Sequence, residues 1–315
     1  MNATLMKRIG LWAVASLSTL LSLACGAAAP GEEAAPTREG AGEAVGEGEG
    51  EEGEGEEGEG EQGEAGEGEG EGEVPAGAPD CAGRRVAGGL VQITNQAEMD
   101  ALADVCSIPG AQVIVSGTTL TTLSLPLLEY VRAEFTITDN NELVSIDLPA
   151  LTHMEGELSI RGNPALQSIS LPSMRRYYGV IAGPSVTNIE LPRMEVAEGN
   201  LVFVGLSVLT SLSLPALRDV RSSFAVTSSA IQTVSVPRLT IVGSDLTVSN
   251  NASLGSISFP ALGDVFSAFN ISRNAVLTSI AAPQLDGGSF IEIFDDPALT
   301  SCIGAEIVNF GDCVQ

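Results

Sequence analysis

The sequence has few of the residues that enzyme and nucleic-acid sites usually require. It contains one histidine, His153, and one lysine, Lys7, and aromatic residues make up 4% of its 315 residues. A catalytic imidazole needs a partner and a nucleophile, and no such motif accompanies His153, which favours a surface or corner position. The net charge of −27 and the lack of a basic stripe argue against nucleic acid as a partner. We therefore expect no enzyme activity and no cofactor.

The longest apolar run lies at the N-terminus and is typical of a signal peptide. Lys7 and Arg8 precede the apolar residues 11–23, a run too short for an ordinary membrane-spanning helix. It ends in "LSLACG", which resembles the lipobox of bacterial lipoproteins, although Ser22 stands where the family usually has leucine. The resemblance implies a signal peptide over residues 1–24, lipidation of Cys25, and a membrane anchor at the bacterial outer membrane or cell surface. An ordinary cleaved signal is the alternative, and it would release the exported protein.

A Gly-Glu-rich segment follows the leader and carries most of the negative charge. Residues 31–80 contain 19 acidic side chains and one arginine. Charge repulsion and glycine entropy oppose folding, so we expect residues 25–80 to form a disordered linker. As a coil of roughly 55 residues it would reach about 40 Å. A G-x-G-x-x-G match at residues 48–53 has no flanking strand or helix and does not predict a nucleotide site.

Four further cysteines lie near the two ends of residues 81–315. Cys81 and Cys106 are near the start of this region, and Cys302 and Cys313 are near its end. Four cysteines allow three pairings, and local disulfides between 81 and 106 and between 302 and 313 are economical for an exported protein. Zinc is a poor alternative because the pairs lack C-x-x-C spacing. We expect disulfides and no metal site.

Residues 81–315 contain a repeat of 20–23 residues, which predicts one stacked domain. The repeats align on a proline: Pro126, Pro149, Pro172, Pro192, Pro215, Pro237, Pro260 and Pro283. A corner column follows each proline: Asn140, Asn163, Gly183, Leu206, Ser228, Asn251, Asn274 and Asp296. Apolar residues alternate on both sides of this column, which indicates short strands with one buried face. Most corner residues favour turns, and proline ends the following strand because it has no amide to donate.

This pattern predicts a mainly β fold, a right-handed β-solenoid of about eight to nine coils. Each coil would contain two strands and at least two corners, and stacked coils would share one continuous core. The N-terminal end of the stack needs a cap. Residues 89–93 are typical of a strand, and Asn95 and Glu98 are placed to cap a short helix reciprocally. Met99 and Leu102 share a face of that helix.

The pattern resembles the receptor L domain, the leucine-rich-repeat-like β-solenoid of insulin- and EGF-receptor ectodomains. The resemblance rests on "GGLVQITNQAEMDALADVC" and on the repeated "N..L.SI.LP.L", and it covers about three quarters of the chain. It implies the fold and a non-enzymatic recognition role. No receptor signalling is implied, because the chain lacks the cysteine-rich module and kinase of those receptors.

The coil between Pro172 and Pro192 is shorter than the others and contains "SMRRYYGVIAG". Arginine and tyrosine are favoured at recognition hot spots, so Arg175, Arg176 and Tyr177 are candidate ligand contacts. Tyr178 is expected to fill the core column of Phe135. The alternative is that the two arginines only solvate a corner.

Carboxylates that could support catalysis are sparse on the outward face. Asp147 and Glu190 are two layers apart, about 10 Å for stacked strands, and both are more typical of solubilising side chains. Asp295 and Asp296 are expected to form a turn rather than a calcium site. The sequence therefore predicts an adhesion or recognition lipoprotein with a protein or glycan ligand. The alternatives are a structural envelope protein without a specific ligand and a carbohydrate-active enzyme.

Overall fold

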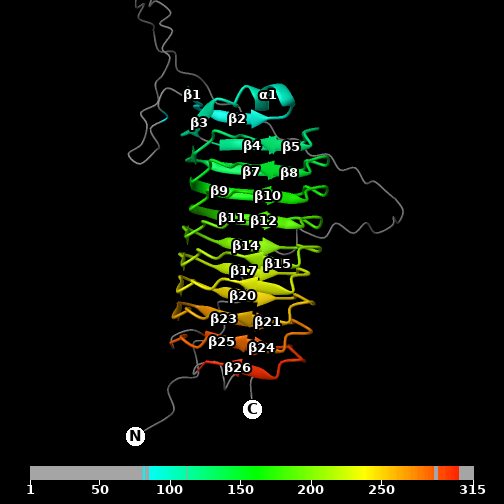
Figure 1. Cartoon of the computed structure of the whole chain (residues 1–315), viewed down its shortest axis with the longest axis vertical. Helices are drawn as coiled ribbons and strands as arrows, with labels where there is room; N and C mark the ends of the chain where they lie inside the picture. Colours follow the sequence, from blue (N-terminus) through cyan, green and yellow to red (C-terminus); the bar gives the residue numbers. More distant parts are fainter. Residues whose placement is uncertain (1–80, 82–84, 111, 287–289, 305–315) are drawn as a thin grey trace, which may run out of the picture. The chain divides into compact units, whose positions relative to one another are not determined.

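Alternating apolar residues fold the repeat into parallel strands that stack coil upon coil (Figure 1). The computed structural model describes residues 81, 85–110, 112–286 and 290–304. Within these residues the chain is a mainly β, parallel solenoid, as the sequence predicted. The signal peptide, Cys25 and the linker lie outside the described residues.

The first face of the solenoid is a ladder of ten strands in the described part of the chain, one or two more than the predicted number of coils. Two of them precede the first repeated proline and were not counted from the sequence. Pairing is parallel throughout. The strands are β2 (Leu90–Ile93), β4 (Gln112–Ser116), β7 (Glu134–Thr138), β9 (His153–Arg161), β11 (Arg176–Ala182), β14 (Leu201–Val204), β17 (Phe224–Thr227), β20 (Leu246–Ser249), β23 (Ala268–Ser272) and β25 (Phe290–Phe294).

The second face carries the three-residue strands that end near each proline, and it is divided into two sheets. The first sheet contains β5 (Thr122–Ser124), β8 (Ser145–Asp147), β10 (Ser168–Ser170) and β12 (Asn188–Glu190). The second contains β15 (Ser211–Ser213), β18 (Thr233–Ser235), β21 (Ser256–Ser258), β24 (Ser279–Ala281) and β26 (Ser301–Ile303). Each central residue points inward and its neighbours point outward, which produces rows of serine and threonine on the surface.

The sequence predicted two strands per coil, but the solenoid has a third face with a further short strand. Two-residue strands form a further parallel ladder, to which the first residues of β9 and β11 also belong. These strands are β6 (Tyr130–Val131), β13 (Val196–Ala197), β16 (Asp219–Val220), β19 (Ile241–Val242) and β22 (Asp264–Val265), with β1 (Arg85–Val86) and β3 (Val105–Ile108) at the N-terminal end. The inward residues of all three faces are buried in one apolar core.

A ladder of buried asparagines holds the corners between the first and second faces. The amide N–H of Asn140 donates to Oδ1 of Asn163 at 3.0 Å, and the amide N–H of Asn251 donates to Oδ1 of Asn274 at 3.1 Å. Asp296 ends the ladder as a buried acceptor for Asn274 N at 2.7 Å, which confirms it as a turn residue. These side chains satisfy backbone groups that the strand ladders leave unpaired.

The residue just before the asparagine column has a left-handed backbone conformation in several coils. At one position the sequence alignment had placed this residue in the column by mistake. Ser229, not Ser228, occupies the column, because its N–H donates to Oδ1 of Asn251 at 3.1 Å. Ser228 has φ +52°, and Asp139, Asn250, Arg273 and Asp295 share this conformation. Left-handed backbone is costly for residues with a Cβ, and its recurrence shows that the corner geometry requires it.

The N-terminal end is closed by a helix and a disulfide. Helix α1 (Gln96–Asp100) begins after Asn95, whose side chain accepts from Glu98 N at 3.1 Å. The carboxylate of Glu98 accepts from Thr94 N at 2.6 Å, so the reciprocal bond goes to Thr94 rather than to Asn95. Met99 is buried beneath the helix.

The disulfide predicted near the start of the domain is confirmed. Cys81 and Cys106 are bonded, with their Cα atoms 5.9 Å apart. Cys302 is also disulfide-bonded. Cys313, its expected partner, lies outside the described residues.

We predict that Asn251→Ala lowers the free energy of unfolding by about 2–6 kcal/mol. The change leaves the amide N–H of Ser229 and the carbonyl of Val226 unpaired in the core, at about 1–3 kcal/mol for each orphaned group. Urea unfolding followed by circular dichroism would measure it, with Ser256→Ala on the exposed face as the control. Equal midpoints for the two variants would contradict a stabilising role for the ladder.

Candidate ligand-binding site

The coil between Pro172 and Pro192 is three residues shorter than the coil before it. The three residues are missing at two of its corners. In the preceding coil three residues lie between the inward Met154 and the inward Leu158, whereas one residue lies between Tyr177 and Gly179. The register between β9 and β11 shifts at this point, where Arg176 pairs with His153 but Tyr178 pairs with Glu157. The third residue is missing at the asparagine corner, where Gly183 stands in the column. Strand β11 therefore runs directly from the third face to the first.

The sequence predicted that Tyr177 is a ligand contact and that Tyr178 fills the core, and the structure shows the reverse burial. Tyr177 is fully buried, so it cannot be a surface contact, and Tyr178 is half-buried at the surface. Gly179, not Tyr178, lies between Leu158 and Leu201 in the core column that Phe135 occupies elsewhere.

The physical reason for this reversal is a compensation of side-chain size within the coil. Tyr177 lies between Met154 and Ala197 in a column that holds valine in several other coils, while Gly179 takes a place held in its neighbours by leucine. The larger side chain of Tyr177 offsets part of the volume lost at Gly179. At Gly179, φ is +145° and a Cβ would lie 1.9 Å from the carbonyl oxygen of Leu158, so glycine is required there.

The missing corner leaves a recess between the corners of the neighbouring coils. We call it the notch; it measures about 300 Å³ and is half-open to solvent. Its lining comes from four successive coils: Tyr130, His153, Met154, Glu155, Arg176 and Glu198. Glu155 and Glu198 project from the full-length corners on either side, and Tyr178 packs against the backbone at Gly199, where a Cβ would lie 2.8 Å from its ring.

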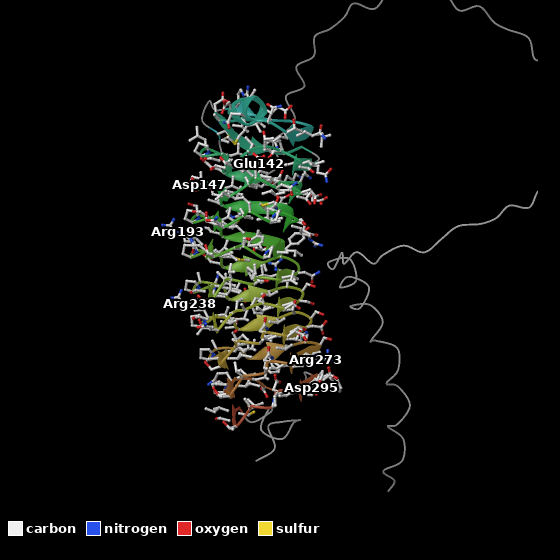
Figure 2. The ribbon with its side chains drawn as sticks, turned by 90° about the vertical axis from the view of Figure 1, so that its right-hand side faces the viewer. Glu142, Asp147, Arg193, Arg238, Arg273 and Asp295 are labelled. Atoms are coloured by element: carbon white, nitrogen blue, oxygen red, sulfur yellow. A yellow bond between two sulfur atoms is a disulfide. The ribbon has the colours of Figure 1, made fainter. Side chains whose placement is uncertain are left out.

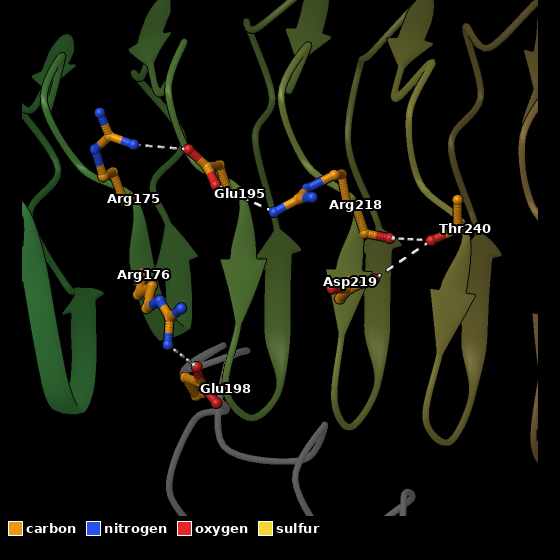
Figure 3. Close-up of polar contacts among 7 residues, drawn as sticks. All are labelled: Arg175, Arg176, Glu195, Glu198, Arg218, Asp219 and Thr240. Atoms are coloured by element: carbon orange, nitrogen blue, oxygen red, sulfur yellow. Dashed lines mark hydrogen bonds and ion pairs between the residues drawn. The ribbon is translucent and has the colours of Figure 1, made fainter.

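Ion pairs link the charged side chains around the notch (Figure 3). Glu198 binds Arg176 at 3.3 Å and Arg221 at 2.5 Å. Next to this pair, Glu195 lies between Arg175 at 2.9 Å and Arg218 at 3.2 Å.

A further pair joins Glu155 to Arg132 at 3.5 Å. Exposed pairs of this kind add little stability, about 0–1 kcal/mol each. Their consequence is a patch of alternating charge on a domain that is otherwise acidic.

Burial perturbs two titratable groups of the notch. Tyr130 is 3% exposed, and its hydroxyl lies beside the carboxylate of Glu155 without a well-aligned hydrogen bond among the described residues. Burial, together with the nearby carboxylate of Glu155, raises its pKa to about 12, so the hydroxyl stays protonated. Partial burial lowers the pKa of His153, and the charges of Arg176 and Arg175 lower it further. The imidazole is therefore neutral at pH 7.

The remaining sequence candidates lie apart from the notch. Asp147 and Glu190 are on the second face, each paired with Ser170 between them. Figure 2 shows Asp147, Arg193 and Arg238 along one edge of the solenoid, and Arg273 with Asp295 along the other. Asp295 pairs with Arg273 at 3.5 Å.

The structure thus brings Arg175 and Arg176 to one surface and adds residues that the sequence did not single out. These are Tyr130, Glu155 and Glu198, which come from other coils, and the shortened repeat was the only sequence signal for their convergence. His153 joins them, and it is exposed, as the sequence predicted. Among the described residues no three acidic, histidine or cysteine side chains are grouped to hold a metal ion. No helix in that part of the chain has the length and apolar character to cross a membrane.

Comparisons with protein-family models, with curated proteins and with solved structures found no match to this chain.

We predict that Tyr177→Phe is neutral or stabilising. The Tyr177 hydroxyl is buried and has no hydrogen-bond partner in the described part of the chain, and an unsatisfied buried hydroxyl costs about 1–3 kcal/mol. Tyr177→Ala should instead lower stability by about 3–5 kcal/mol because it opens a cavity. Thermal unfolding of the three proteins measures both effects. A phenylalanine variant that melts well below the parent would show that the hydroxyl has a partner.

We also predict that the pKa of His153 lies below 6.5 and rises in Arg176→Gln. The variant removes the larger of the two arginine contributions and keeps a side chain of similar length. His153 is the only histidine, so its imidazole resonance can be titrated by proton NMR without assignment. The unfolded chain binds this proton more readily, so the His153 contribution to stability is complete above pH 6.5 and falls as the pH drops below it. An unchanged pKa in the variant would contradict the placement of Arg176 beside His153.

Proposed function

We propose that the protein is a non-enzymatic recognition lipoprotein of the bacterial cell envelope, which binds a surface ligand through the notch. In this proposal Cys25 anchors the chain to the membrane and the acidic linker holds the solenoid away from it. The solenoid supplies a rigid surface on which outward residues can differ without disturbing the core. The resemblance to the receptor L domain, with its first strand, capping helix and cysteine, supports a recognition role.

One observation carries the proposal: the coil that departs in length from its neighbours is also the place where charged and aromatic side chains converge. Elsewhere the outward positions of the second face are mostly serine and threonine, which suit plain solvent exposure. At the notch, the Tyr130 hydroxyl is buried without a well-aligned hydrogen bond among the described residues. The same short coil also interrupts the asparagine column, at Gly183. Departures of this kind from an otherwise consistent pattern are expected where function imposes them.

Binding fits the geometry of the notch better than hydrolysis. A glycosidase needs one carboxylic acid that is protonated and one carboxylate across the scissile bond. Both notch carboxylates, Glu155 and Glu198, have arginine partners at 3.5 Å or less. Such pairing already uses the carboxylate oxygens as acceptors from arginine, which suits ligand contact and not proton donation. We therefore assign Glu155 and Glu198 to ligand contact.

We predict that Arg176→Gln reduces attachment of the purified protein to its target by at least tenfold. Arg176 lines the notch, whereas Glu198 keeps Arg221 as a partner in the variant, so the fold should be retained. Arg238→Gln removes the same charge from an exposed corner outside the notch lining and is the matched control. The measurement is labelled protein bound to whole bacterial and host cells and to immobilised glycans. Equal attachment by the two variants would contradict a role for the notch, and no attachment by the parent protein would contradict a recognition function.

A further inference from the structure

The base of the notch contains a buried hydroxyl that makes no well-aligned hydrogen bond within the described part of the protein. Tyr130 is 97% removed from solvent and lines the notch, and the Glu155 carboxylate lies close enough to its hydroxyl to raise the pKa of Tyr130. Leaving a buried hydroxyl unpaired is unfavourable, and a ligand oxygen that accepts from it removes that cost. The tyrosine ring lies in the third face between Ser107 and His153, so its position is fixed by the strand ladder.

The charges around the notch are already balanced by one another. Arg132 pairs with Glu155, and Arg176 and Arg221 both pair with Glu198. An anionic ligand would have to compete with these carboxylates for the arginines, and a cationic ligand would compete with the arginines. A neutral ligand with hydroxyl groups can accept from an arginine and donate to its carboxylate while the ion pair stays intact.

The size and the remaining lining of the notch limit the ligand further. About 300 Å³ is at the lower end for small-molecule sites, which suits one sugar ring and not a peptide or an extended chain. Met154 gives apolar surface for the C–H groups of a ring. Hydrogen-bond donors such as Arg176 and acceptors such as Glu155 and Glu198 surround Met154 in the notch. This arrangement matches a sugar, because each of its hydroxyls is both a donor and an acceptor.

We propose that the notch binds a single neutral sugar unit of a glycan, with Tyr130 donating a hydrogen bond to a ring or hydroxyl oxygen and Arg176, Glu155 and Glu198 contacting its hydroxyls. This inference rests on the proposed recognition function and names the ligand class of the same site. Contacts by neutral hydroxyls make binding nearly independent of ionic strength, because no net charge is neutralised.

The test uses the purified protein and methyl glycosides of glucose, galactose, mannose and N-acetylglucosamine as neutral probes. Glucuronate and glucosamine are the anionic and cationic comparisons. Binding is followed by the NMR resonance of His153, the only imidazole in the chain, which lies in the notch. We expect at least one neutral glycoside to shift this resonance with the same dissociation constant, within twofold, at 50 and 500 mM salt.

Two tyrosine variants separate the site from general effects on folding. Tyr130→Phe removes only the donor and should weaken binding of the neutral glycoside at least tenfold without lowering the melting temperature. Tyr178→Phe changes a neighbouring half-buried tyrosine outside the notch lining and should leave the affinity unchanged. Equal affinities for the two variants, or binding of only the charged sugars, would overturn the inference.

The outcome also distinguishes this inference from the proposed function. If cells are bound and Arg176→Gln abolishes that binding, but no sugar shifts His153, the recognition function stands and the neutral-sugar assignment is wrong. If neither cells nor sugars are bound, both proposals are wrong. Release of methanol from a bound glycoside would refute the non-enzymatic function and support the sugar site.

Discussion

The parallel backbone ladder between coils is the interaction on which the rest of the structure depends. Within each sheet, every inner strand pairs in parallel with a strand of the coil before it and of the coil after it, and the second face is interrupted between β12 and β15. Register then stacks equivalent side chains, which creates the apolar columns and the buried asparagines. Because side chains alternate between core and solvent, a slip by one residue would expose a whole strand's apolar set. The ladders accept coils of 22 and 23 residues, as between Leu201, Phe224 and Leu246, whereas the shorter coil between Pro172 and Pro192 needs compensation.

The short coil shows what that compensation consists of. Its strand β11 keeps the ladders of the first and third faces by omitting the corner between them, and it exchanges a large side chain at Tyr177 for glycine at position 179. Other features are lost: the asparagine column is interrupted, and the second face divides between β12 and β15. These losses weaken the stack locally. The gain is a recess whose walls are full-length corners held by intact ladders on both sides, so the site is preorganised by its neighbours.

Regular features were predictable because each was repeated many times in the sequence. The apolar columns and the turn role of Asp296 follow from patterns that several coils share, whereas the helix cap at Asn95 follows from the local spacing of Asn95 and Glu98. Tyr177 was misplaced because its coil has no equal in length to align with. Counting from the prolines would have corrected this, since Val131, Met154 and Tyr177 each lie five residues after theirs. The notch itself could not be predicted, because its residues come from four coils and meet only if two particular corner positions are missing.

The charge distribution explains why a polar site of this kind can exist on so acidic a chain. Residues 81–315 contain 11 arginines, and five of them surround the notch, each within 3.5 Å of a carboxylate. Long-range repulsion from a protein of net charge −27 acts on anions but not on neutral molecules. Affinity for a neutral ligand would then depend on the direction of the hydrogen bonds, and those directions are fixed by strands in register. The backbone ladder would in this way set both the fold of the solenoid and the specificity of its site.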